Sequence, residues 1–294
     1  MRIRHLLLAI STAALLGCSG GNPGESAEGR MRIIDVCRQN LALAEAGRLA
    51  DEAFHFTQCG AAGILIDWDW DVVTGMMLSD VYYSMGHVAL AQKLAFEANV
   101  CSERDYEPEA VKRLIQTNII YGAWDVAEKY ICLLEKDRSY RSWATGQRRF
   151  LGDSDAVMND PEYGPRMGCI PEIDFTTGSK AADSDLKTII RTNPGYGKTI
   201  GYLGVMYLAD CDFDNFRALL DEFYGTEALP ALPASFAEAA CMMSELEPGY
   251  WKKVGVDSGT FRRYKEFCSR MDAGLSLDRF SDSYWYYVKN IFEK

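Results

Sequence analysis

The chain has 294 residues, with 31 basic and 42 acidic side chains and a formal net charge of −11. A protein this acidic is a poor partner for nucleic acid and for anionic lipid headgroups, because both repel it. Hydrophobic residues make up 48% of the chain and aromatic residues 12%, which is ample for a core and excludes disorder for most of the length. The length suits one large domain or two smaller ones.

The first residues are typical of an exported bacterial lipoprotein. Arg2 and Arg4 precede a short apolar run over residues 6–16, and small residues follow. This run is too short to span a bilayer, which takes roughly 20 apolar residues. It ends in Leu-Leu-Gly-Cys18, which resembles a lipobox, so we expect cleavage after residues 1–17 and lipidation of Cys18. An unlipidated signal peptide is the alternative.

The segment after the cleavage site is the expected tether. Residues 18–30 are rich in Gly, Ser, Asn, Pro and Glu, a composition typical of flexible linkers. Ser19 follows the lipidated cysteine without a run of acidic residues, which favours an anchor that faces the periplasm over surface display. We expect a location in the cell envelope, in the outer membrane rather than the inner one. Loss of the two leader arginines makes the mature chain more acidic by two charges.

Residues 31–150 carry helical periodicity with an internal repeat. Within residues 75–103, the spacing of six residues is that of a tetratricopeptide (TPR) repeat: Leu78, Tyr82, Gly86, Ala91, Ala95 and Ala98. Leu78 and Tyr82 share one face of a first helix, and Gly86 allows a tight turn. The three alanines let a second helix pack closely, so the pattern predicts a helical hairpin.

The same pattern recurs elsewhere in the chain. Gly122 and Ala127 repeat it 36 residues later, and a third copy has Cys211 in place of the turn glycine. An earlier copy, over residues 40–56, has its alanine one residue out of step. Four degenerate hairpins predict an all-α fold, a short TPR-like α-solenoid.

The pattern fails over residues 151–184, which hold three prolines and four glycines between Gly152 and Ser184. We expect an irregular loop there, packed against the solenoid. Residues 185–294 are predicted to hold further helical repeats and a helical cap. The final helix, over residues 284–291, is rich in aromatic residues, which suits a cap on the end of the stack.

Cysteine usage leaves two interpretations open. Eight cysteines follow Cys18 at wide, irregular spacings without a CxxC pair: Cys37, Cys59, Cys101, Cys132, Cys169, Cys211, Cys241 and Cys268. An oxidising compartment permits disulfides, whereas the apolar surroundings of several of them favour buried thiols. A zinc site is not expected, because the mature chain has only His55 and His87, far apart in sequence.

Asn193–Thr199 resembles the end of a phosphate-binding P-loop, but the position of its first glycine holds Thr192. We therefore expect no nucleotide and no cofactor, and interpret Asn193, Pro194 and Gly195 as the opening of a helix.

Three carboxylates alternate with Trp68 and Trp70 over residues 67–71, as in a calcium loop. An EF-hand would need Gly and Glu where this chain has Val72 and Leu78. A hairpin connection with buried tryptophans and solvated acids is the preferred interpretation, so no metal site is assigned.

A basic cluster interrupts the acidic chain near its middle. Arg138, Arg141 and Arg148 surround Trp143, and guanidinium groups with an aromatic face suit a carboxylate or an acidic sugar. The alternative is pairing of these arginines with acidic neighbours on adjacent helices. The candidate binding residues are Trp68, Trp70, Trp124, Arg138, Arg141, Trp143 and Arg148.

Several runs carry a family resemblance: Asn40 to Gly47, Leu114 to Ile120, Ala127 to Ile131 with Leu133 to Glu135, Trp143-Ala144 and Asn193-Pro194. Through these runs the chain resembles an uncharacterised Bacteroidetes family, and the resemblance extends from residue 31 to the C-terminus. The resemblance implies a helical periplasmic region of unknown function behind a multi-spanning membrane region. Here a lipobox replaces those spans, and the family supplies no catalytic residues.

No catalytic constellation is visible, since neither His55 nor His87 lies in a nucleophile motif. We therefore expect a non-catalytic, membrane-anchored scaffold that binds an envelope protein or peptide in a solenoid groove. The alternative is a lipoprotein that binds a glycan or small molecule in a cleft lined by tryptophans and arginines. Tryptophans packed between helices favour the scaffold, and tryptophans exposed together on one face favour the ligand site.

Overall fold

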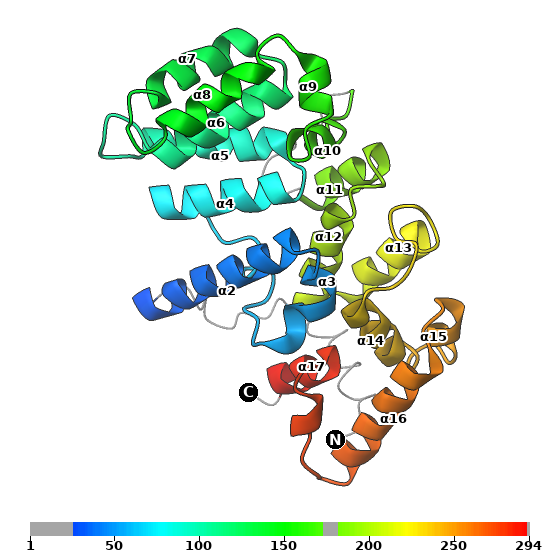
Figure 1. The fold of residues 1–294 in the computed structure, drawn as a ribbon. Coiled ribbons are helices and arrows are strands. Elements are labelled where there is room, and N and C mark those ends of the chain that lie inside the picture. Colours follow the sequence, from blue (N-terminus) through cyan, green and yellow to red (C-terminus); the bar gives the residue numbers. More distant parts are fainter. Residues whose placement is uncertain (1–25, 173–181, 293–294) are drawn as a thin grey trace. The chain divides into compact units, whose positions relative to one another are not determined.

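The computed structural model describes residues 26–172 and 182–292 (Figure 1). The expected signal peptide, Cys18 and most of the tether lie outside these residues. The described chain is all-α, as predicted, and contains no β-strand. Its contacts divide it into two compact units, Leu65–Ile200 and the combination of Met1–Ile64 with Gly201–Lys294. None of the described helices has the length and apolar character needed to cross a membrane.

The unit of residues 65–200 is built from helices that pack in chain order (Figure 1). Each helix contacts the next one along the chain: α4 (Val72–Ser84), α5 (Val88–Val100), α6 (Pro108–Ile120), α7 (Trp124–Leu134) and α8 (Arg141–Gln147). Ala91, Ala95 and Ala98 have no exposed surface, so α5 packs closely as their small size predicts. The two predicted hairpins of this unit, α4–α5 and α6–α7, are present.

The hairpin turns have a shared geometry. Gly86 and Gly122 adopt φ values of +84° and +69°, in the left-handed region where a side chain is strained. In each case the next amide reaches back across the helix end, from His87 to the Tyr82 carbonyl at 2.8 Å and from Ala123 to the Asn118 carbonyl at 2.9 Å. Both turns therefore satisfy helix-end carbonyls in the manner of a Schellman motif.

The prediction of an irregular loop over residues 151–184 is wrong in part. This stretch contains α9 (Ser154–Met158), α10 (Tyr163–Met167) and the start of α11 (Ala182–Thr192), after the 3-10 turn η2 (Arg148–Phe150). The Asp153 side chain caps α9 by accepting a hydrogen bond from Ala156. Buried Arg166 donates from Nε to the Tyr83 carbonyl at 2.9 Å, so the segment packs against the hairpins as expected.

The second unit begins earlier than predicted. Helix α2 (Ala27–Glu45) starts inside the expected tether, because the Ser26 hydroxyl accepts the Gly29 amide at 3.0 Å and caps it. The early repeat is not a full hairpin, since α3 (Leu49–Glu52) and the 3-10 turn η1 (Ala53–His55) end after seven residues. The Gln58 side-chain amide donates a hydrogen bond of 2.5 Å to the Ala53 carbonyl, at the end of this short helical segment.

The remaining helices of this unit come from the C-terminal part of the chain: α12 (Lys198–Ala209), α13 (Phe213–Phe223), α14 (Ala234–Met243), α15 (Tyr250–Lys253), α16 (Ser258–Asp272), η4 (Asp278–Phe280) and α17 (Tyr284–Phe292). Helix α12 begins in the first unit and continues into this one. It starts at Lys198, later than the helix start expected at Asn193. Helices α12 and α13 flank the turn at Cys211, where the third hairpin is predicted.

The turn between α12 and α13 repeats the glycine geometry without a glycine. Cys211 has φ +56°, and the Asp212 amide reaches back to the Tyr207 carbonyl at 2.8 Å. Burial of the thiol, together with the contact of its Sγ with the Tyr284 hydroxyl at 3.9 Å, holds the residue in this conformation. Cysteine in place of the turn glycine therefore preserves the turn geometry.

The core of the second unit joins its N-terminal segment, around residues 50–54, to its C-terminal helices. The Asp51 carboxylate accepts the Ala234 amide at 2.7 Å, and the Ser235 hydroxyl donates to the Ala50 carbonyl. The Phe54 ring meets Tyr284 edge-on, with ring centroids 4.8 Å apart. The aromatic helix α17 is thus buried against η1 and α14 within this unit.

The cysteines from Cys37 to Cys268 are all free thiols in the described residues. Four of them are buried: Cys37, Cys169, Cys211 and Cys241. Cys132, expected among apolar neighbours, is exposed and lies 3.2 Å from Arg148. Of the two interpretations, the structure follows the one with reduced thiols.

Candidate functional site

Two of the predicted binding residues form a stacked pair. The Trp68 and Trp70 rings lie 4.0 Å apart at an interplanar angle of 28°. Trp70 is 73% exposed and has φ +58°, an outlying conformation for a bulky residue. Trp68 is half-buried, and its indole Nε1 has no hydrogen-bond partner among the described residues. The expectation that both tryptophans insert into the core is therefore wrong for Trp70.

The carboxylate segment around this pair has a structural use. Asp71 caps α4 by accepting the Thr74 amide at 2.9 Å, which places Trp70 directly before the first turn of the helix. Over residues 26–172 and 182–292, no group of three or more His, Cys, Asp or Glu side chains could hold a metal ion.

The other predicted residues lie on later helices. Trp124 begins α7, whereas Trp143 lies on α8 under the Lys112 ammonium, which is 5.5 Å from its ring centroid. Helices α5 and α6 come between α4 and α7 in the packing order. The candidate residues thus divide into two groups and do not assemble into the single cleft that the sequence suggested.

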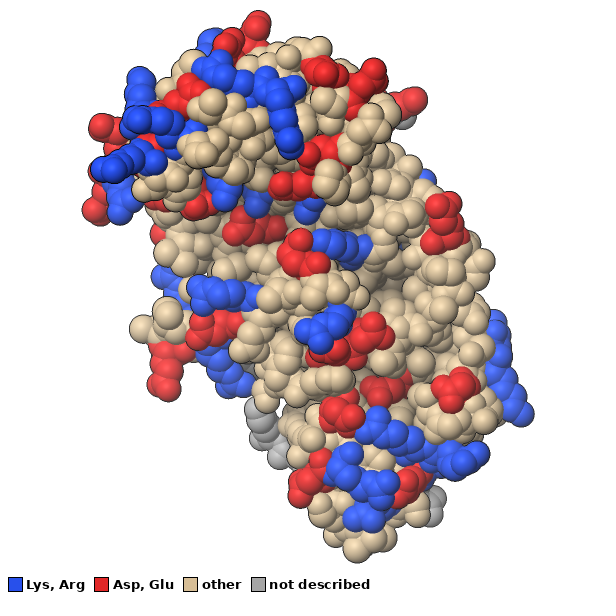
Figure 2. All heavy atoms as spheres, viewed as in Figure 1, with Lys and Arg blue, Asp and Glu red and all other residues tan. Residues whose placement is uncertain are grey.

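The arginine cluster follows its ion-pair alternative at Arg148. Arg148 donates two hydrogen bonds of 2.9 Å to the two carboxylate oxygens of Glu135, and these bonds lower the pKa of Glu135 to about 2. Arg141 donates to the Glu135 carbonyl at 2.8 Å, and Arg138 is exposed. Basic and acidic side chains lie next to one another over α7 and α8 (Figure 2). This face is therefore not a uniformly positive surface that would attract an anion.

His87, which directly follows the turn glycine Gly86, is buried. Its Nε2 lies 3.3 Å from the Asp185 carboxylate, and its Nδ1 accepts the Leu90 amide at 3.4 Å, which caps α5. Burial lowers the pKa of His87 against the opposing effect of Asp185. The pair joins α11 to the α4–α5 hairpin, and no nucleophilic side chain accompanies it in these contacts.

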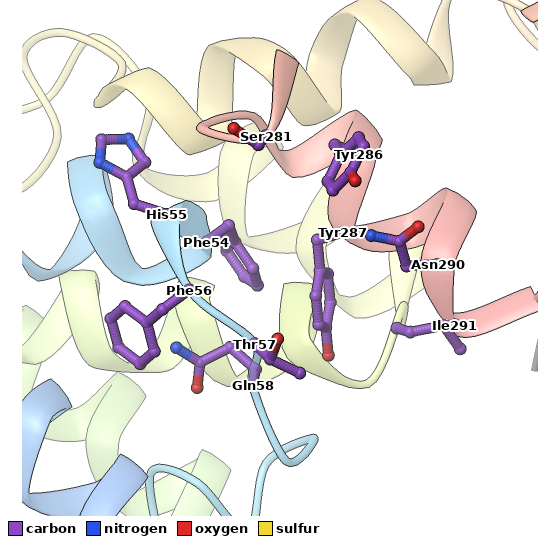
Figure 3. Close-up of a pocket in the computed structure, with 10 residues that line it drawn as sticks. All are labelled: Phe54, His55, Phe56, Thr57, Gln58, Ser281, Tyr286, Tyr287, Asn290 and Ile291. Carbon is purple, nitrogen blue, oxygen red and sulfur yellow. The ribbon is translucent and has the colours of Figure 1, made fainter. Parts of the chain in front are cut away.

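A pocket that sequence reasoning missed lies in the second unit. It has a volume of about 360 Å³ and lies between residues 54–58 and the end of the chain around α17 (Figure 3). Ten residues line it: Phe54, His55, Phe56, Thr57, Gln58, Ser281, Tyr286, Tyr287, Asn290 and Ile291. We call this the α17 pocket. Its volume falls at the lower end of the roughly 300–1,000 Å³ typical of ligand sites.

The inner wall of the α17 pocket is rigid. Phe54 and Tyr287 are buried with ring centroids 4.9 Å apart, and the Tyr287 hydroxyl donates to the Ala209 carbonyl at 2.7 Å. The Gln58 amide is held by Asn40 in two hydrogen bonds, of 2.8 and 3.1 Å. Side chains from the two segments face each other across the hollow (Figure 3).

The pocket escaped sequence analysis because its two walls are more than 200 residues apart in the chain. One signal was available: aromatic residues gather both at Phe54 and Phe56 and at Tyr286 and Tyr287. A sequence pattern cannot show that these two groups meet. Their pairing depends on the contact of η1 with α17, which only the fold reveals.

The fold and this pocket define an all-α protein with a small hollow lined by aromatic and polar side chains. A model described as a family of unknown function (DUF6057) matches residues 26–290, so the chain belongs to that family. No curated protein and no solved structure matches the chain.

Proposed function

We propose that this protein is a non-catalytic scaffold of the bacterial cell envelope that binds a protein or peptide partner. Its TPR-like hairpins would present the interaction surface, and the lipid on Cys18 would hold it at the periplasmic side of a membrane, in place of the membrane spans expected in its Bacteroidetes relatives. No nucleic acid, nucleotide or cofactor takes part in this proposal.

One observation carries the proposal: large apolar side chains are exposed at one end of the α4–α5 hairpin. We call Trp70, Val73, Phe96 and Val100 the hairpin-end patch; each is between 52% and 73% exposed. The start of α4 and the end of α5 meet there, since a Cβ on Gly75 would lie 3.0 Å from the Ala98 Cβ. Exposed apolar groups of this size favour a partner's surface over water.

The backbone of Trp70 supports the same proposal. A left-handed conformation costs a bulky residue on the order of 1–3 kcal/mol, yet Trp70 gains little burial in return. Stacking on Trp68 holds the ring in a fixed orientation without a partner. A pre-oriented aromatic side chain loses little conformational entropy on binding, which is the character of an interface anchor.

The test is a crosslinking pull-down of the anchored protein from its native cells, with four forms compared. The proposal expects one envelope protein to be recovered with the wild type and with Met158→Ala, which removes an exposed apolar side chain from α9. Recovery should fall with Trp70→Ala and with Cys18→Ala. Equal recovery from Trp70→Ala and Met158→Ala, or no recovery at all, would refute the scaffold.

A second candidate function is a lipoprotein that binds a glycan or small molecule. The arginine and tryptophan cleft expected for it is not assembled, but the α17 pocket supports this function from a different part of the chain. Binding of sugars to the whole protein, without any protein partner, would favour it over the scaffold.

A further inference from the structure

We infer that the α17 pocket binds a neutral oligosaccharide, with Tyr286 as the ring on which a sugar stacks. This inference rests on the second candidate function and is independent of the scaffold. It follows from three properties of the pocket: the available aromatic surface, the kind of hydrogen-bonding groups at its rim, and the charge of its lining.

The aromatic surface is divided between support and contact. Phe54 and Tyr287 are buried and packed together, so they hold the wall. Phe56 and Tyr286 are half-buried and line the hollow from its two segments (Figure 3), and the Lys289 ammonium lies 5.9 Å from the Tyr286 ring centroid. The face of an aromatic ring is electron-rich and attracts the weakly positive C–H groups of a sugar ring. Two rings that line the hollow therefore favour a ligand with flat C–H faces.

The rim carries five polar side chains that are available for a ligand. None of their side-chain atoms has a hydrogen-bond partner among the described residues: His55, Thr57, Ser281, Tyr286 and Asn290. These groups are three hydroxyls, a carboxamide and an imidazole, side-chain types that can both donate and accept hydrogen bonds. A sugar hydroxyl can also donate and accept a hydrogen bond. The adjacent hydroxyls of a sugar therefore match these side chains better than a ligand group that can only donate or only accept.

The charge of the lining excludes other ligand classes. No Lys, Arg, Asp or Glu is among the ten residues of the α17 pocket. A phosphate or carboxylate would lose its hydration on binding without gaining a guanidinium or ammonium partner. A cation would lose its hydration without gaining a carboxylate partner. A neutral ligand therefore has the smallest desolvation penalty on entering the pocket.

A second hollow continues the site beyond Tyr286. It has a volume of about 380 Å³ and shares Tyr286 with the α17 pocket; its other lining residues are Met271, Gly274, Leu275, Ser276, Leu277, Asp278 and Lys289. Its charged lining residues, Asp278 and Lys289, are one of each sign, so it too has no net charge. Two adjoining hollows with a common aromatic residue suit consecutive sugars of a chain, which is why we infer an oligosaccharide and not a single sugar.

The test is calorimetric titration of the full-chain protein in a detergent without a sugar headgroup. The probes are maltohexaose, cellohexaose, xylohexaose and mannohexaose, with polygalacturonate as the acidic comparison and decaproline as the peptide comparison. We expect at least one neutral hexasaccharide to bind with a dissociation constant on the order of 1 mM or below.

Variants then assign binding to the pocket. Tyr286→Ala should weaken the affinity by about tenfold or more, the equivalent of losing one aromatic stacking contact. Tyr286→Phe keeps the ring and should lose only part of that affinity. Tyr130→Ala, which removes a half-buried tyrosine from α7, should bind as the wild type does. Unchanged thermal unfolding temperatures show that the variants are folded.

The outcomes separate this inference from the functions above. Binding of polygalacturonate alone would overturn the neutral ligand and leave a glycan-binding lipoprotein. Binding of decaproline alone would overturn both and favour the scaffold. No binding by any saccharide, or equal binding by Tyr286→Ala and the wild type, would also overturn the inference.

Discussion

The two units reach a helical core by different routes. In residues 65–200, each helix from α4 to α8 packs on its neighbour in sequence, joined by short turns. In the other unit, residues near the start of the chain pack against helices some 200 positions later, as the hydrogen bond from Ala234 to Asp51 shows. Contacts between sequence neighbours have a small loop-closure cost, whereas those between chain ends depend on a completed fold. The second unit should therefore fold more slowly than the first.

The largest expected effect comes from closing the tightest contact of the second unit. A Cβ on Gly204 of α12 would lie 2.0 Å from the Phe236 ring, and Phe236 is fully buried in edge-on contact with Phe216. Gly204→Ala should lower the free energy of unfolding by about 3 kcal/mol, because the new Cβ overlaps a ring that is packed on all sides. Urea unfolding followed by circular dichroism measures it.

Gly201→Ala is the matched control, one helical turn earlier on α12. Its Cβ would meet only the Ala50 methyl at 3.8 Å, which is ordinary contact. Alanine is favoured over glycine inside a helix, so this variant should gain about 0.5–1 kcal/mol. Equal stability of the two variants would contradict the close α12–α14 packing.

The second prediction concerns the pH dependence of the same unit. Glu238 is buried on α14, accepts the Tyr284 amide at 2.7 Å, and faces Arg263 at 3.6 Å, with Asp282 as a further acidic neighbour. Burial raises the pKa of Glu238 from 4.5 to about 7. Because the folded state holds the proton more tightly than the unfolded state, this group stabilises the fold at low pH, and stability falls as pH rises from 4.5 to 7.

By linkage, the loss across this window is about 3 kcal/mol. Glu238→Gln keeps a neutral carbonyl for the Tyr284 amide and should remove this slope. Glu266→Gln, a change at a half-buried glutamate on α16 that pairs with Arg279, should leave it intact. Denaturant titrations at pH 4.5, 6, 7 and 8 provide the comparison; a slope that persists in Glu238→Gln would assign it to other groups.

The same contrast explains what could be predicted from the sequence. The all-α class and the hairpins at Gly86 and Gly122 follow from local spacing, and the helix-turn-helix at Cys211 lies where the pattern predicts it. The short helices α9 and α10 were missed because prolines and glycines dominate that stretch, although Pro165 and Gly164 lie inside α10 itself. Helix signals from capping residues such as Asp153 were outweighed by this composition.

The binding residues were harder to predict than the fold. The sequence placed Trp68 and Trp70 in a connection, but neither the left-handed backbone of Trp70 nor its exposure is encoded in a short pattern. Arg148 was selected for its charge, and its pairing with Glu135 depends on the crossing of two helices. The α17 pocket was not predicted, because its walls meet only through long-range packing.

The third prediction compares two glycine turns within the sequence-local unit. Gly122→Ala should cost about 1 kcal/mol for its left-handed φ alone, since the nearest atom to the new Cβ, on Trp124, is 3.5 Å away. Gly86→Ala should cost about 2 kcal/mol, because its Cβ would also lie 2.8 Å from the Cys169 Sγ. Chemical denaturation of both variants measures the difference, and equal losses would show that Cys169 moves aside freely.

The smallest effect tests whether the three turns differ only in their caps. The residues after the turns have similar backbone angles, and the side chains of His87 and Asp212 cap their helices, whereas Ala123 cannot. Ala123→Ser places a hydroxyl where it can accept the Val126 amide, as Asp212 accepts that of Asn215 at 3.1 Å. We expect a gain of about 0.5 kcal/mol, measured as a rise in the urea midpoint.

The reciprocal change, Asp212→Ala, should cost about 1 kcal/mol by removing the cap of α13. One outcome would contradict the gain expected at position 123: Ala123→Ser leaves the stability unchanged while Asp212→Ala lowers it. That result would mean that the Val126 amide is already satisfied by its 3.1 Å bond to the Ala123 carbonyl. In that case the helix end of α7 is closed by its backbone, and the caps at His87 and Asp212 belong to the particular packing of each turn.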